Sequence, residues 1–132
     1  MTPYLIDTSV FLWNFGETQR LGPRVRELLR RSVDPVFVSA ATSWEIAIKT
    51  ASGKLQLPES PRDFFRTRLA LAGFRPLPIT QEHALTAGEL PRLHSDPFDR
   101  MLVAQAQTEN MVLITSDRQL LKYSVPTLWS GK

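Results

Sequence analysis

Short apolar runs alternate with helical patterns along the chain, and this alternation restricts the possible folds more than any other feature of the sequence. The apolar runs predict strands at residues 4–7, 35–39, 75–80, 111–117 and 125–129. The remaining pattern predicts helices at residues 8–15, 23–31, 40–55, 60–73, 80–90, 97–110 and 118–123. Strands that alternate with helices are typical of a parallel sheet covered on both faces. We therefore predict an α/β fold with a mostly parallel central sheet. The two prolines in 75–80 indicate an edge strand.

The size and composition are those of one ordinary globular domain. The chain has 132 residues, of which 42% are hydrophobic and 22% charged, so we expect a single domain over residues 1–132. Cysteine is absent, which excludes a disulfide framework, a thiolate nucleophile and a cysteine metal site. The N-terminus has no signal-peptide pattern, and no segment has the ~20 apolar residues that span a bilayer. We expect a cytoplasmic protein that is not bound to a membrane.

Four of the thirteen acidic residues stand where surface acids are not expected. Asp7 and Asp117 directly follow apolar runs, at the carboxyl ends of two predicted strands. Glu45 lies in a helix with a narrow polar face, and Asp99 lies in the first turn of a strongly apolar helix. Each also has an ordinary interpretation, because the three aspartates suit helix N-termini and Glu45 suits the exposed side of an amphipathic helix.

Considered together, the four positions favour a metal site. Open parallel sheets bind their ligands at the carboxyl ends of the strands, and the helix that carries Glu45 directly follows a strand. Carboxylates gathered at one rim raise one another's pKa unless a cation is present. Mg²⁺ and Mn²⁺ prefer oxygen ligands. We therefore expect such an ion beside these four acids, where it suits phosphoryl chemistry.

The segment HSDPFDRMLVAQA, residues 94–106, carries two acids within one helical turn. Asp96 precedes Pro97 and is predicted to be the N-cap of the helix. Asp99 is predicted to be the acid that faces the metal. The two histidines, His83 and His94, lie outside any nucleophile pattern, and we expect both to be ordinary surface or structural residues.

The order of these motifs resembles that of the PIN-domain family, and in particular its VapC-type toxins. The matching segments are YLIDTSVFLW, VSAATSWEIAIKTASGKLQL, DPFDRMLVAQA and LITSD. They span nearly the whole chain in the family's order. The resemblance implies a three-layer α/β/α sandwich and a toxin of a type II toxin–antitoxin pair. It also implies a metal-dependent endoribonuclease that cleaves RNA phosphodiester bonds with Mg²⁺ or Mn²⁺.

The resemblance further implies site residues and partners. The four family acids, as catalytic residues and metal ligands, correspond to Asp7, Glu45, Asp99 and Asp117. Ser9 and Ser116 would support the site by hydrogen bonding, and Asp96 is an acid beyond the usual four. The implied partners are an RNA substrate and a VapB-like antitoxin. The implied assembly is a homodimer or a hetero-oligomer with the antitoxin.

The formal net charge of +3 and the arginine-rich segments 20–31 and 62–68 are compatible with RNA, although such runs are also common on solvated helix faces. Arg24 and Arg100 are the candidates for phosphate contacts, and pairing with a nearby acid is the alternative for Arg100.

Two other functions are alternatives to the ribonuclease. One is a non-catalytic RNA- or partner-binding module on the same fold, which has no need of four repelling carboxylates. The other is a haloacid-dehalogenase-like phosphatase, to which DTSV bears some likeness. Ser9 stands where that family has its second aspartate, which disfavours the phosphatase.

Overall fold

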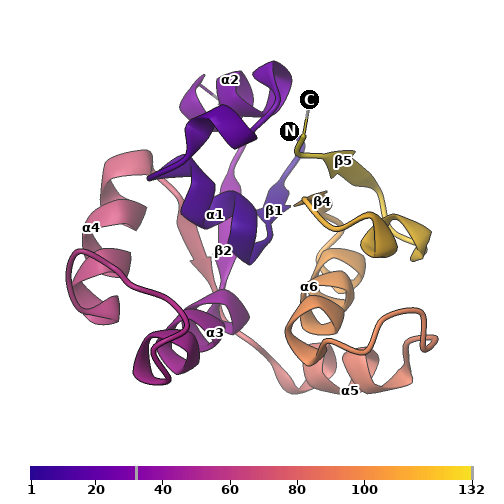
Figure 1. The fold of residues 1–132 in the computed structure, drawn as a ribbon. Helices are drawn as coiled ribbons and strands as arrows, with labels where there is room; N and C mark the ends of the chain where they lie inside the picture. The colour runs from indigo at the N-terminus through magenta and orange to yellow at the C-terminus, as the bar shows by residue number, and fades with distance from the viewer. Residues whose placement is uncertain (32, 132) are drawn as a thin grey trace.

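One five-stranded parallel sheet organises the chain (Figure 1). The structure is a computed structural model, and it describes residues 1–31 and 33–131. The strands are β1 (Tyr4–Ile6), β2 (Val36–Ser39), β3 (Arg75–Leu77), β4 (Val112–Thr115) and β5 (Thr127–Trp129). Their order is β3-β2-β1-β4-β5, and each neighbouring pair is parallel. The predicted parallel sheet is confirmed, and so is the edge position of β3.

Helices follow the predicted pattern closely. They are α1 (Thr8–Asn14), α2 (Pro23–Arg31), α3 (Ala40–Ala51), α4 (Pro61–Ala72), α5 (Gln81–Glu89) and α6 (Pro97–Thr108). The side chains of Ser60, Thr80 and Asp96 cap the first turns of α4, α5 and α6. Because these residue types are favoured N-caps, the starts of the three helices could be predicted from the sequence. The segment predicted as a short helix at 118–123 is the 3₁₀ helix η2 (Arg118–Lys122), and a second one, η1 (Thr18–Arg20), was not predicted. Among the described residues, no helix combines the length and apolar character needed to cross a membrane.

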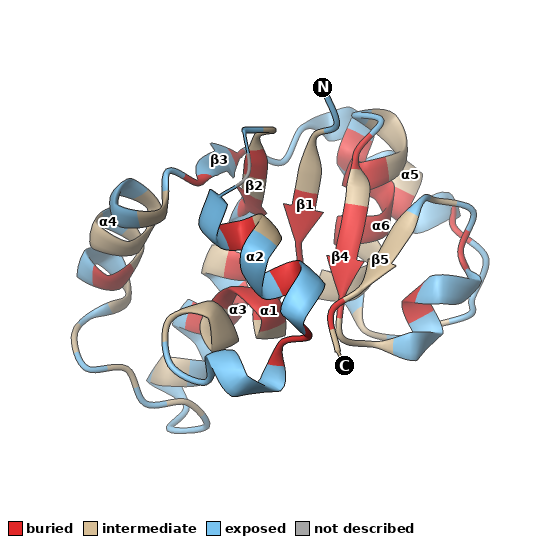
Figure 2. Ribbon diagram, turned by 90° about the horizontal axis from the view of Figure 1, so that it is seen from above, coloured by how far each residue is buried: buried red, intermediate tan, exposed pale blue. Residues whose placement is uncertain are grey.

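Both faces of the sheet are covered. Leu5 and Ile6 of β1 are fully buried, and they lie in two separate apolar clusters because successive strand residues point to opposite faces. Ile6 belongs to the cluster with Val10 of α1 and Phe64 of α4, and Leu5 to the cluster with Val103 of α6. In Figure 2 the buried central strands run between helices whose outer sides are exposed. The predicted three-layer α/β/α arrangement is therefore confirmed.

The strand register brings distant parts of the sequence to one edge. Ile6 pairs with Val38 of β2 and with Ile114 of β4. β1 ends at Ile6, whereas β2 and β4 each continue one residue further, to Ser39 and Thr115, and α1 and α3 begin just beyond the ends of β1 and β2. The Asp7 amide donates to the Ile114 carbonyl at 3.0 Å, which extends the ladder to the first acid. The carboxyl ends of β1, β2 and β4 thus form one rim.

Gly73 ends α4 in the left-handed conformation, with φ 70°. A Cβ at this position would meet no atom within 4 Å, so Gly73→Ala changes backbone strain alone. We expect the free energy of unfolding, measured with urea, to fall by about 1 kcal/mol. Gly88 within α5 is the matched control, because its Cβ would also be free of contacts. Gly88→Ala is expected to raise the same quantity by about 0.5 kcal/mol, and effects of equal sign would contradict this account.

Candidate active site

Asp7 ties β1 to β4 through its carboxylate. The side chain is buried, and its Oδ1 accepts from the Val10 amide at 2.8 Å, which caps α1. Its Oδ2 accepts from Thr115 Oγ1 and from the Ser116 amide, both at 2.8 Å, and from Ser116 Oγ at 3.3 Å. Burial raises the pKa of Asp7, although these hydrogen bonds act in the opposite direction. Asp7 is therefore both a helix cap and a buried carboxylate at the rim of the sheet.

Glu45 is a buried carboxylate with a fixed position. Its Oε1 accepts from Thr8 Oγ1 at 2.6 Å, and its Oε2 lies 2.7 Å from Lys49 Nζ. This hydrogen bond to Glu45 raises the pKa of Lys49. The interpretation of Glu45 as an exposed helix residue is wrong. Lys49 was missed, although its i,i+4 spacing from Glu45 was a visible signal of pairing.

Asp96 and Asp99 have different roles at the start of α6. Asp96 Oδ1 accepts from the amides of Phe98 at 2.8 Å and Asp99 at 3.3 Å, which confirms Asp96 as the N-cap. The Asp99 side chain is partly buried. Its burial, followed by the nearby charges of Asp96 and Asp7, raises the pKa of Asp99 to about 7, while His94 acts in the opposite direction.

His94 and Asp117 complete the group. Asp117 Oδ1 accepts from the Gln119 amide at 2.9 Å and caps η2, and Asp117 Oδ2 lies 2.8 Å from His94 Nε2. The same nitrogen lies 3.1 Å from Asp99 Oδ2. His94 was expected to be an ordinary surface or structural residue, and the structure places it between two candidate site acids. No signal in the sequence indicated this placement. For His83 the interpretation is confirmed, because that buried ring completes the capping of α5.

These side chains line one cavity of about 380 Å³. Its lining consists of Asp7, Thr8, Ser9, Glu45, Lys49, Asp96, Asp99, Ser116, Asp117 and Arg118. All the acids and serines singled out in the sequence are in this set. Its five carboxylates outnumber its two cationic side chains, so the lining offers a hard cation the oxygen donors that it prefers and an excess of acidic groups. His94, Asp99 and Asp117 offer donor atoms that lie within 4.8 Å of one another.

The two arginine candidates lie outside this cavity lining. Arg24 is exposed on α2. The Arg100 guanidinium donates to the carbonyls of Ala87 at 2.8 Å, Pro91 at 3.0 Å and Leu90 at 3.1 Å. Arg100 therefore holds the loop between α5 and α6 in place, a role that the sequence did not indicate. RNA contact by Arg24 or Arg100 stays a prediction.

The raised pKa of Asp99 makes the stability of the metal-free protein depend on pH. Between pH 4 and about 7 the folded protein keeps a proton on Asp99 that the unfolded chain releases at its ordinary pKa of about 3.9. The free energy of unfolding therefore falls as pH rises through this range. Asp99→Asn removes that fall and, allowing for solvent screening, is expected to stabilise the protein at pH 8 by about 2 kcal/mol. Urea unfolding in EDTA at several pH values measures the effect, and parallel pH profiles for the two proteins would contradict it.

Comparison with known proteins shows which family this chain belongs to. The family model described as PIN domain matches residues 4–126. Ribonuclease VapC22 from Mycobacterium tuberculosis is 31% identical over 98% of this chain and 100% of its own length. The structure of VapBC2 from Rickettsia felis, bound to a DNA fragment from the promoter, has a TM-score of 0.71 at 13% identity. That match covers 98% of this chain and all of the other.

A second solved structure, VapBC-1 from nontypeable Haemophilus influenzae, has a TM-score of 0.65 at 18% identity and covers 96% of this chain and 97% of its own. These structural matches show a shared fold. The family match extends over nearly all of the elements that build the carboxylate cavity, from β1 to the segment after β4. The chain therefore belongs to the PIN-domain family.

Proposed function

We propose that this protein is the toxin of a type II toxin–antitoxin pair and acts as a metal-dependent endoribonuclease. The observation that carries the proposal is the convergence of Asp7, Glu45, Asp99 and Asp117, which are far apart in the sequence, on one cavity. Gathering so many acids is unfavourable without a cation. Burial first, and then the charges of Asp96 and Asp7, raise the pKa of Asp99. The similarity to a protein named as a ribonuclease, over almost the full length of both chains, supports the same reaction.

Each acid has a distinct part in the proposed reaction. Asp7 and Asp99 would be the primary ligands of Mg²⁺ or Mn²⁺, and Asp117 would hold a second ion or orient water. Glu45 helps to hold the metal or accepts a proton from the attacking water. When bound, the ion supplies charge stabilisation to the scissile phosphate and lowers the pKa of a water. The hydrogen bonds of Thr115 and Ser116 keep Asp7 aimed at the cavity.

The other side chains of the cavity position the acids. Lys49 holds one oxygen of Glu45 and Thr8 holds the other, so the carboxylate keeps one orientation. Ser9 lines the same cavity and supplies a further hydroxyl. A small divalent ion binds best to donors that are held in place beforehand.

RNA and an antitoxin are the proposed partners, and a homodimer or a complex with the antitoxin is the proposed assembly. The solved relatives named as VapBC complexes support a VapB-like antitoxin. Arg24 and other exposed arginines are proposed to contact RNA phosphates, which would make the affinity depend on salt. We propose that this activity takes place in the cytoplasm.

Removal of a primary ligand should abolish cleavage but not RNA binding. We expect Asp7→Asn and Asp99→Asn each to lower the rate of RNA cleavage, with Mg²⁺ or Mn²⁺ present, by about 100-fold or more. Gel assays of a mixed RNA substrate measure cleavage, and filter binding measures affinity. A wild-type protein that binds RNA but cleaves none with either ion would favour the non-catalytic binding module.

Asp96→Asn is the matched control, because it changes an acid in the same turn of α6. Asn is also a good N-cap, so we expect a loss of about 1 kcal/mol or less in unfolding free energy and most of the cleavage activity to remain. A loss as complete as that of Asp99→Asn would reverse the assignment of the two acids.

A further inference from the structure

We propose that His94 occupies the place of a divalent cation in the metal-free protein and leaves it when the ion binds. The proposal rests on the function proposed above. His94 Nε2 lies 2.8 Å from Asp117 Oδ2 and 3.1 Å from Asp99 Oδ2, so it stands between the two carboxylates. Asp99 and Asp117 could both hold a divalent cation, and such an ion would compete with this N–H group for the space between them.

The backbone of Asp96 decides which nitrogen of the ring carries the proton. The Asp96 amide donates to His94 Nδ1 at 3.2 Å. Since an amide N–H can only donate, Nδ1 is the acceptor, and the proton of the neutral ring is on Nε2. A nitrogen that carries a proton has no free lone pair for a metal. His94 therefore donates a hydrogen bond to Asp117 and lies close to Asp99, and in this arrangement it is not a metal ligand.

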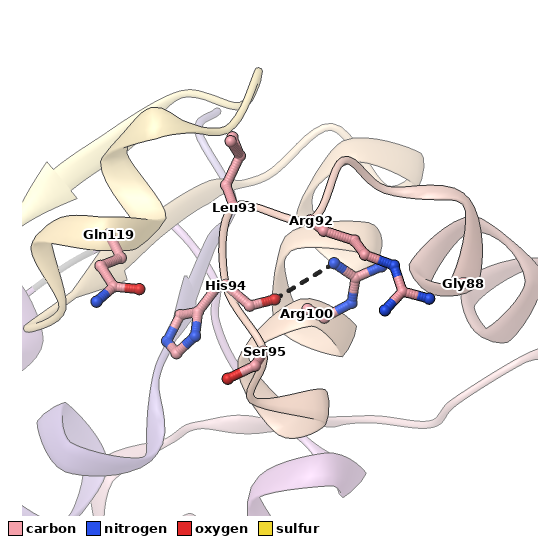
Figure 3. Close-up of a pocket in the computed structure, with 7 residues that line it drawn as sticks. All are labelled: Gly88, Arg92, Leu93, His94, Ser95, Arg100 and Gln119. Carbon is pink, nitrogen blue, oxygen red and sulfur yellow. Dashed lines mark hydrogen bonds between the residues drawn. The ribbon is translucent and has the colours of Figure 1, made fainter.

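The main chain of His94 is held firmly on both sides. Its amide donates to the Tyr123 hydroxyl at 3.0 Å, and its carbonyl accepts from Arg100 at 3.4 Å. Figure 3 shows the ring on one side of the loop and the Arg100 contact on the other. Only the side chain of His94 is left to move, by rotation about its own bonds.

Space for the displaced ring lies next to the site. A cavity of about 490 Å³ adjoins His94 and is lined also by Ser95 and Gln119, which are drawn beside it in Figure 3. This cavity is where the proposal places the displaced ring, after rotation about the side-chain bonds of His94. His94 Nε2 is hydrogen-bonded to Asp117 and lies close to Asp99, and in the proposal the ion replaces these contacts.

Binding of Mn²⁺ to the full chain tests this exchange. Isothermal titration of the metal-free protein is expected to show about tenfold tighter Mn²⁺ binding by His94→Ala than by wild type, because the ion no longer replaces charge-assisted hydrogen bonds. In EDTA at pH 8, where Asp99 is ionised, the same variant should unfold at a lower temperature, since the two carboxylates then repel without a donor between them. His94→Gln retains an N–H donor and should lie nearer to wild type in both measurements.

Leu93→Ala is the control, because Leu93 lies on the same loop and is half exposed; it should leave Mn²⁺ affinity unchanged. Equal or weaker Mn²⁺ binding by His94→Ala would overturn the proposal, and weaker binding would make His94 a ligand. That result would leave the proposed function intact if wild type still binds Mn²⁺ and cleaves RNA. Failure of both proteins to bind Mn²⁺ would overturn the proposal and the metal-dependent function together.

Discussion

The contact between the Asp7 carboxylate and the segment after β4 is the interaction on which the site depends. Asp7 is next to Ile6, which pairs with Ile114, so the sheet itself delivers the carboxylate to Thr115 and Ser116. These donors stabilise a charge that burial disfavours. Without them only the Val10 amide would hold the carboxylate at the centre of the rim.

The site shows a conflict between stability and function. Five acids around one cavity repel one another, and this repulsion destabilises the fold. Nearby hydrogen-bond donors reduce the destabilisation while the acids themselves are retained. Lys49 neutralises Glu45, backbone amides hold Asp96, and His94 stands between Asp99 and Asp117. What is left is the raised pKa of Asp99. Burial is the first cause of this shift and the neighbouring acids are the second, and the physical basis for placing an ion is the set of five carboxylates around one cavity.

Residues differ in how well they could be predicted. The helix starts at Ser60, Thr80 and Asp96 were predictable because capping acts over three residues. The four acids stood out because each breaks an apolar pattern. His94 and Arg100 were not predictable, because their partners come from separate segments. His94 meets Asp117, and Arg100 meets carbonyls at the end of α5. A single histidine or arginine does not change the hydrophobic periodicity of a helix or strand, so its contacts can be identified only in the folded structure.

The sequence by itself determined the alternation of strands and helices, the parallel sheet that follows from it, and the acids at the strand ends and helix starts. These depend on hydrophobic periodicity and capping, which act between near neighbours. Only the tertiary structure decided which groups surround each carboxylate, how deeply each is buried, and that a histidine stands between two of them. Burial and electrostatic interaction depend on distance in space, and the strand register sets those distances between residues as far apart as Asp7 and Ser116.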